Sequence, residues 1–369
     1  MWFDEAMEPS SIQFDPDAPG TGDGIYGLPH TPEQAAVIVI PVPWEATASY
    51  GTGTAQGPAA IRTASQQVDL YDHETGRPYE RGIAMLPIPE EIVDWNREAR
   101  AATDRVFAIS EELGNWPTPD HREASALVAR VNQLGAQLND WVEATTVRWR
   151  DQGKIVAVVG GDHSVPLGAI RATARAHPGM GILHLDAHAD LRNAYMGFTY
   201  SHASIFDNVM REPAVAKLVQ VALRDLSNAE ARAIESSEGR IVAYFDSDLQ
   251  NRLLGGEPWG AIVDEIAGAL PKMVYLSFDI DGLDPALCPN TGTPVPGGLG
   301  FAQVLRLMRA VVESGRRIVG LDLCEVSPGP EGASEWDANV GARLLYKMIG
   351  FTLLTHPPIH PESRSRARS

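Results

Sequence analysis

Short apolar segments alternate with helix-like segments through the second half of the chain, and this alternation limits the fold more than any other feature of the sequence. The apolar segments cover residues 154–161, 179–188, 216–223, 240–246, 272–281 and 316–326. Strands that are almost continuously apolar and separated by helices are typical of a parallel sheet covered on both faces. In such sheets, ligands bind at the carboxyl ends of the strands.

The other parts of the chain suggest one large domain with two irregular ends. Residues 37–40 predict a further buried strand, which we expect Pro41 and Pro43 to end. Residues 97–150 have helical spacing, interrupted at residues 115–120. The regions expected are an irregular N-terminal arm (residues 1–35), one folded domain (36–350) and a flexible basic tail (351–369).

Composition narrows the choice of partners. The 369 residues include 30 basic and 48 acidic side chains, which gives a formal net charge of −18. This balance argues against nucleic acid as a partner and is compatible with a cationic substrate. Two cysteines are too few for a disulfide framework, and no apolar run approaches the roughly 18 residues of a membrane span. We therefore expect a cytoplasmic protein without a membrane partner.

Three of the predicted strands end in motifs rich in Asp and His. The motifs are GGDHS (160–164), DAHAD (186–190) and SFDIDGLDP (277–285). Residues two apart in an extended strand point the same way, so Asp186, His188 and Asp190 are expected to converge. Clustered carboxylates repel one another unless a cation compensates their charge. The motifs therefore predict a metal site with six ligands: His163, Asp186, His188, Asp190, Asp279 and Asp281.

Six ligands of this kind suit two ions better than one. Carboxylates with some imidazole favour Mn²⁺ and related divalent ions, without distinguishing Mn²⁺ from Ni²⁺, Zn²⁺ or Fe²⁺. Bridging carboxylates are typical of two-metal hydrolytic sites, in which the ions supply hydroxide near neutral pH. Asp162 and Asp284 lie beside the ligands in the motifs, and we expect both to fix loops by accepting backbone hydrogen bonds.

The three motifs, followed by TGTPVPGG at residues 291–298, resemble those of the ureohydrolase family of arginases and agmatinases. The resemblance runs from about Ile38 to about Lys347. It implies a three-layer α/β/α fold with a mostly parallel eight-stranded sheet, a binuclear manganese centre and hydrolysis of a guanidinium group to release urea. It also implies assembly into homo-trimers or homo-hexamers.

The same resemblance assigns roles to individual residues. The six predicted ligands match the family's metal positions, whereas the position of His184 is not a ligand in the family. His202 matches the histidine that assists proton transfer, and Glu325 matches the acidic residue that hydrogen-bonds the guanidinium. The catalytic residues expected on this basis are His202, Glu325 and Asp190.

Aromatic residues in the loops near these motifs bear on the substrate. Tyr195 follows DAHAD, in place of the short polar loop of the arginase pattern, and Trp44 follows the first strand. The motifs EVSP (325–328) and EWDANVGARLLYK (335–347) resemble an agmatinase-like branch that includes guanidine hydrolases, with which nickel has been associated. If the aromatic side chains line the pocket, it is small; core packing is equally compatible with them.

We therefore expect a small cationic guanidino substrate, with free guanidine ahead of agmatine, and two Mn²⁺ or Ni²⁺ ions per subunit. The expected substrate-binding residues are Glu325, His202, Trp44 and Tyr195. Agmatinase and guanidinobutyrase are the alternatives within the family. A deacetylase-like amide hydrolase is expected to use a single zinc, and a non-catalytic metal-binding protein is expected to have lost part of the catalytic set, which is intact here.

Overall fold

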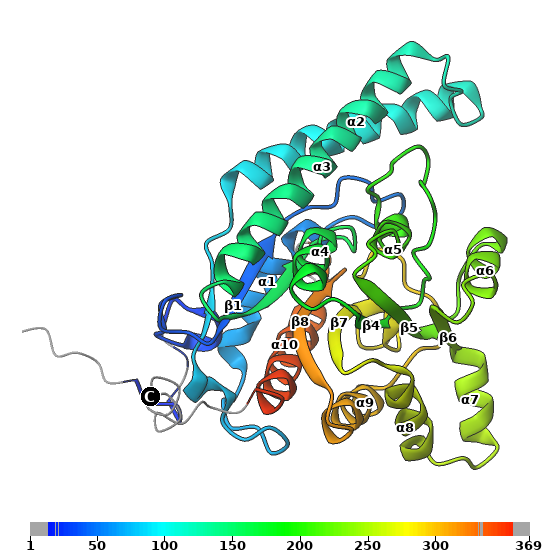
Figure 1. Ribbon diagram of the computed structural model, residues 1–369. Coiled ribbons are helices and arrows are strands. Elements are labelled where there is room, and N and C mark those ends of the chain that lie inside the picture. Colours follow the sequence, from blue (N-terminus) through cyan, green and yellow to red (C-terminus); the bar gives the residue numbers. More distant parts are fainter. Residues whose placement is uncertain (1–13, 19, 21, 331, 333–334, 357–369) are drawn as a thin grey trace, which may run out of the picture.

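Eight strands form one sheet in the computed structural model, which describes residues 14–18, 20, 22–330, 332 and 335–356 (Figure 1). All neighbouring strands are parallel, in the order β2-β1-β3-β8-β7-β4-β5-β6. Their bounds are β1 (Val37–Val42), β2 (Ile83–Met85), β3 (Ile155–Gly160), β4 (Met180–Leu185), β5 (Val215–Leu223), β6 (Ile241–Phe245), β7 (Met273–Asp279) and β8 (Arg317–Cys324). The predicted eight-stranded sheet is confirmed.

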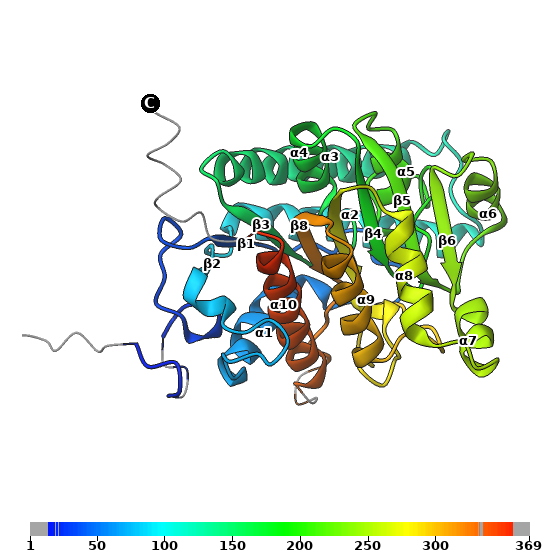
Figure 2. The ribbon, with the colours of Figure 1, turned by 60° about the horizontal axis from the view of Figure 1, so that its bottom comes forward.

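Helices cover both faces of this sheet, which confirms the three-layer arrangement (Figures 1 and 2). One face carries α1 (Gly57–Ala64), α8 (Trp259–Ala269), α9 (Phe301–Glu313) and α10 (Trp336–Leu354); the other carries α2 (Glu90–Leu113), α3 (Arg122–Arg150), α4 (Leu167–Ala176) and α5 (Ile205–Met210); α6 (Asn228–Glu235) and α7 (Asp246–Leu254) lie near β6. Strand β1 shows why the strands are apolar throughout. Val37 and Val39 pack in the core beneath α1 and α10, whereas Ile38 and Ile40 pack beneath α2 and α3.

Strand β1 runs through Pro41, which was expected to end it. Pro41 lies opposite Val159 of β3. On the other side of β1, the short strand β2 pairs only as far as Val39, so β1 is an edge strand beyond that residue. Proline is tolerated at a sheet edge because no neighbouring strand needs its missing N–H. With three residues, β2 is too short to produce a periodic pattern, and it was not predicted.

The domain extends beyond both predicted boundaries. Ile25, Tyr26 and Leu28, within the predicted irregular arm, are buried. The Tyr26 hydroxyl donates a hydrogen bond to the Ala342 carbonyl (3.0 Å). Helix α10 continues to Leu354, so residues 351–354 belong to the domain and not to the tail. Residues 1–13 and 357–369, which make up much of the predicted arm and tail, lie outside the described residues.

Helices α2 and α3 form a long hairpin with the interruption that the sequence predicts. Gly114, with a φ of 67°, caps α2 in the left-handed conformation that favours glycine. Among the helices that the structure describes, none combines the length and the apolar character needed to cross a membrane.

This hairpin holds the loop that follows β4. The Trp116 ring, in the connection between α2 and α3, packs edge-on against Phe198 with 6.5 Å between the ring centroids. Asn132 of α3 donates to the Gly197 carbonyl (3.0 Å) and accepts from the Thr199 N–H (2.8 Å). The backbone of this loop is therefore fixed on both sides of residue 198.

Candidate metal centre

Four neighbouring strands place the predicted site residues at one edge of the sheet. Strands β3, β8, β7 and β4 are adjacent, and their carboxyl ends lead into GGDHS, Glu325, the DID motif and DAHAD respectively. Asp279 is the last residue of β7, and Asp281 lies in the 3-10 helix Ile280–Gly282 that follows it. Parallel strand order thus brings together residues more than 160 positions apart, at the place where such sheets bind ligands.

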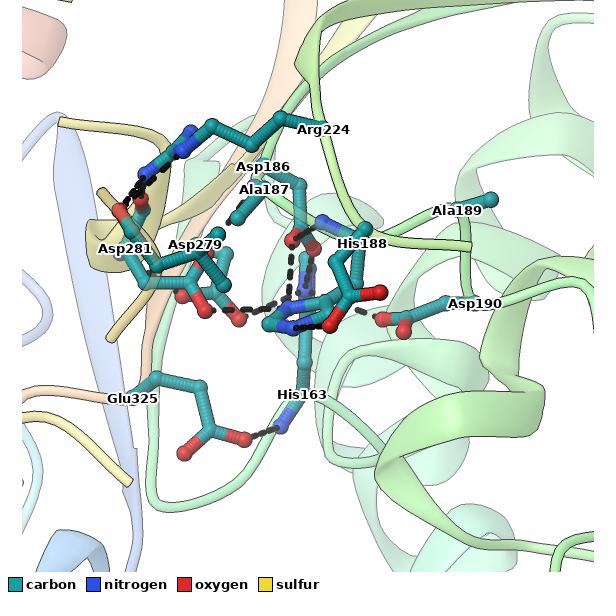
Figure 3. Close-up of polar contacts among 12 residues, drawn as sticks. His163, Asp186, Ala187, His188, Ala189, Asp190, Arg224, Asp279, Asp281 and Glu325 are labelled. Atoms are coloured by element: carbon teal, nitrogen blue, oxygen red, sulfur yellow. Dashed lines mark hydrogen bonds and ion pairs between the residues drawn. The ribbon is translucent and has the colours of Figure 1, made fainter. Parts of the chain in front are cut away.

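One group of ligands converges on the ring of His163 (Figure 3). Its Nδ1 lies 3.0 Å from Asp186 Oδ2, 3.2 Å from Asp279 Oδ2 and 3.6 Å from Asp190 Oδ2. All four side chains are buried. One imidazole nitrogen and three carboxylate oxygens in this arrangement fit a divalent cation of the Mn²⁺ type.

A second group lies on the other side of Asp186. His188 Nδ1 is 3.0 Å from Asp281 Oδ2 and 3.4 Å from Asp186 Oδ1. Asp281 is buried. Asp186 therefore presents one carboxylate oxygen to each group, as a ligand bridging two ions does, and all six predicted ligands lie together.

The electrostatics of the cluster indicate that it needs positive charge. Burial by itself lowers the pKa of His163 and of His188, but the surrounding carboxylates outweigh burial and raise both pKa values well above the ordinary range. Burial and the charge of Asp186 raise the pKa of Asp190 well above that of an ordinary carboxyl. Divalent cations would supply the charge that these protons otherwise provide, so the residues present fit a binuclear centre.

Two residues that were not predicted orient His163. Its Nε2 lies 3.0 Å from Ser277 Oγ, and the Ser277 hydroxyl donates to Asp322 Oδ1, also at 3.0 Å. Because the single hydroxyl proton points to Asp322, Ser277 accepts the hydrogen bond from His163 Nε2–H. That leaves Nδ1 of a neutral ring free to bind metal. The sequence did contain a signal, since both residues are polar positions inside almost continuously apolar strands.

A third unpredicted residue, Arg224, fixes the loop that carries Asp281. Its Nη2 donates to the carbonyls of Asp281 (2.6 Å) and Val295 (3.0 Å), and its Nε donates to Val295 at 3.2 Å. An arginine directly after β5 is thereby shared between the DID motif and the TGTPVPGG segment. His184, whose Nε2 lies 2.8 Å from Asp186 Oδ2, is buried beside the first group of ligands.

Glu325 and His202 lie beside this cluster. Glu325 Oε1 accepts a hydrogen bond from the His163 N–H at 2.9 Å, and the backbone of Glu325 has a φ of 62°. His202 Nδ1 lies 3.3 Å from Thr47 Oγ1. Burial, followed by the nearby charge of His188, lowers the pKa of His202 to about 4. His202 is therefore neutral at pH 7, the state in which an imidazole can accept a proton.

The pocket next to the ligands has a volume of about 180 Å³. Tyr195 lines it, as expected, and the Tyr195 ring stands edge-on to His202 with 5.9 Å between centroids. Trp44 does not line it. Its side chain is fully buried in the core formed with α2 and α3, which corrects the expectation that Trp44 binds substrate. Its position next to β1 turns the indole inward, away from the pocket.

Comparison with known proteins agrees with this geometry, because the sequence model of the arginase family matches residues 35–350. The chain belongs to the arginase family. It is 35% identical over 329 residues to the N(1)-aminopropylagmatine ureohydrolase of Thermus thermophilus, covering 88% of this chain and 94% of that protein. It is 32% identical to the guanidinobutyrase of Pseudomonas aeruginosa, covering 69% and 78%.

Solved structures of the same fold include the agmatine ureohydrolase of Thermoplasma volcanium. The TM-score is 0.69 at 23% identity, with 90% of this chain and 95% of that chain covered. Arginase-family enzymes use a binuclear divalent metal centre, and the two His and Asp groups of this chain are placed to hold one. This arginase-family protein is therefore a hydrolase that releases urea from a guanidino compound.

Proposed function

We propose that this arginase-family hydrolase acts on a substituted guanidine with a cationic tail, of the agmatine type. The observation that carries the proposal is the extent of the pocket. From His188 and Asp190 it continues past the ligands to Asp225 and Glu230, so it has room and carboxylates for a tail beyond the guanidinium. The acidic net charge of the chain is compatible with such a substrate.

Charge at the outer wall of the pocket favours a cation. Arg192 lies 3.6 Å from Glu230 and stacks over the Tyr195 ring, so its charge is largely compensated. The Asp225 side chain is 68% exposed, and its nearest charged neighbour among the described residues is His188 at 4.0 Å. One carboxylate therefore remains to attract an ammonium group on the substrate.

The reaction requires attack on a carbon that resonance makes a poor electrophile. Two divalent ions, when bound by the six ligands, supply a strong oxygen nucleophile near neutral pH. Glu325 orients the planar guanidinium through charge-assisted hydrogen bonds. His202, neutral at pH 7, can accept a proton and pass it to the departing amine, which leaves urea as the other product.

Free guanidine loses its support as the preferred substrate. That expectation required aromatic side chains to close the pocket. Trp44 is instead buried in the core. Of the aromatic side chains proposed to close the pocket, Tyr195 is the one that lines it among the described residues.

The test is urea release from agmatine, N1-aminopropylagmatine, 4-guanidinobutyrate, arginine and guanidine, with enzyme loaded separately with Mn²⁺ and with Ni²⁺. We expect the highest kcat/KM for a substrate with a cationic tail. Preference for guanidine would refute the proposal. Preference for 4-guanidinobutyrate, whose tail is anionic, would also refute a cationic tail and would indicate that Arg192 binds the tail.

A charge-neutral variant sharpens this test. Asp225→Asn is expected to raise KM for the cationic substrate about threefold, which is the effect of one exposed carboxylate. Asp264→Asn is the matched control, since the Asp264 side chain is equally exposed at 68% but lies on α8. Equal KM values for the two variants would remove Asp225 from the tail site.

A further inference from the structure

A second, much smaller cavity lies beside the metal ligands. It has a volume of about 10 Å³, enough for one water-sized group. His202 and Glu325 line it together with Asp162, the loop around Tyr50 and the turn at Thr293. Asp162 belongs to neither group of metal ligands.

One oxygen of Asp162 is fully occupied and the other is free. Oδ1 accepts hydrogen bonds from the N–H (3.0 Å) and the hydroxyl (2.5 Å) of Ser164, as expected for a residue that fixes its loop. Oδ2 has no hydrogen-bond partner among the described residues, and water does not reach it because Asp162 is only 1% exposed. A buried carboxylate oxygen without a partner is costly, so it indicates a ligand.

The charges around the cavity specify what kind of ligand this is. Glu45, a third carboxylate nearby, is already satisfied because its Oε2 accepts from the Gly53 N–H at 2.6 Å. Glu325 Oε1 is occupied by the His163 N–H. No lysine or arginine lines the cavity within the described part of the chain. The cavity therefore presents carboxyl oxygens without a cationic partner, and the group that satisfies such oxygens most strongly is a cationic N–H donor.

We propose that Asp162 Oδ2 accepts a hydrogen bond from a terminal amino group of the substrate's guanidinium, opposite Glu325. This inference rests on the proposed function. A guanidinium presents donors in several directions of one plane, more than the free oxygen of Glu325 can accept. Asp162 thus acts as a second substrate-binding carboxylate that selects the planar cation over its neutral counterpart urea.

The experiment compares binding of guanidinium chloride and of urea, which share a planar shape but differ in charge, by calorimetry on the metal-loaded enzyme. Asp162→Asn keeps the acceptor for Ser164 and replaces Oδ2 with an amide donor. We expect the ratio of guanidinium to urea affinity to fall by about tenfold to a hundredfold, as for loss of a hydrogen bond to a charged group. Metal content measured on the same samples confirms that both ions remain bound.

Ser164→Ala is the matched control, because it weakens the loop contact but leaves Oδ2 in place. Its affinity ratio is expected to equal that of the wild type. If Asp162→Asn does not fold, Asp162→Ser serves instead, since its hydroxyl can still accept from the Ser164 N–H. An unchanged ratio in the folded variant would overturn the inference. If the ratio is unchanged but the wild-type enzyme releases urea, the role of Asp162 is refuted and the proposed function stands. If the ratio changes but the wild-type enzyme releases no urea, the proposed function is refuted and binding of guanidinium by Asp162 stands.

Discussion

The link from His163 through Ser277 to Asp322 leads to a quantitative prediction about metal binding. Ser277→Ala removes two hydrogen bonds of 3.0 Å, one of them to a carboxylate. The ring of His163 then loses the contact that keeps Nδ1 directed at the carboxylates. Removing such a support of a ligating histidine typically lowers metal affinity 10- to 100-fold, or about 1.4 to 2.7 kcal/mol.

Ser65→Ala separates this effect from general destabilisation. Ser65 is also fully buried and also makes two hydrogen bonds, accepting from the Tyr26 N–H (2.8 Å) and donating to the Arg62 carbonyl (2.7 Å). Both variants are expected to lose about 1–2 kcal/mol of unfolding free energy. Mn²⁺ affinity, measured by titrating the metal-free proteins, is expected to fall only in Ser277→Ala. Equal affinities in the two variants would refute the orienting role.

Two further predictions concern stability and the pocket loop. Lys347→Met removes the ammonium 2.6 Å from Asp72 Oδ2 and is expected to cost about 2 kcal/mol in urea unfolding at pH 7. Burial opposes ionisation of Asp72, but the hydrogen bond from Lys347 and those from Thr75 together outweigh it and lower the Asp72 pKa below 3.8. The loss of unfolding free energy in Lys347→Met is therefore complete above pH 3.8 and decreases as the pH falls through the lowered pKa of Asp72. A difference in unfolding free energy that does not change with pH would contradict this. Asn132→Ala removes two hydrogen bonds to the loop that carries Tyr195 and is expected to raise KM about fivefold without changing metal affinity. Gln137→Ala, at an exposed position of α3, is the control and is expected to leave KM unchanged.

The sequence predicts the sheet well because strands that are buried on both faces have almost continuously apolar sequences. The six apolar segments after residue 153 correspond to β3 to β8, each within a few residues of the observed bounds. Periodicity did not reveal strand β2 or the continuation of β1 through Pro41, because both depend on which strands lie next to each other in the sheet. Packing of Tyr26 against α10 involves residues 316 positions apart, so no local pattern reveals it.

The candidate ligands were found by reasoning that the structure supports only in part. Asp186, His188 and Asp190 were expected to converge because they alternate along an extended strand. Strand β4 ends at Leu185, and Asp190 has a φ of 53°, so this backbone is not extended. His188 consequently faces Asp281, whereas Asp190 turns toward His163. Both groups of ligands form, but through a bend that the spacing did not predict.

Trp44 and Tyr195 show why the pocket was harder to predict than the ligands. Both are aromatic residues in loops that follow strands, so the sequence alone does not distinguish the one that lines the pocket from the one in the core. The direction of each side chain depends on the packing of α2 and α3, which bury Trp44 and hold the Tyr195 loop from outside. The lining of the pocket depends on these directions, whereas strand order and the bend after β4 bring the candidate ligands together.

The backbone at Asp190 and Glu325 connects this placement with function. Both residues have positive φ values, 53° and 62°, which cost a non-glycine residue about 1–2 kcal/mol. The surrounding hydrogen bonds hold them there, because the Glu325 N–H donates to the Gly161 carbonyl (2.8 Å) and the Asp190 carbonyl accepts from the Phe206 N–H (3.0 Å). Glycine would adopt these conformations without strain but would lose the carboxylate. The fold therefore keeps a strained acidic residue at each position, which directs the Asp190 carboxylate toward the ring of His163 and the Glu325 carboxylate toward the His163 N–H.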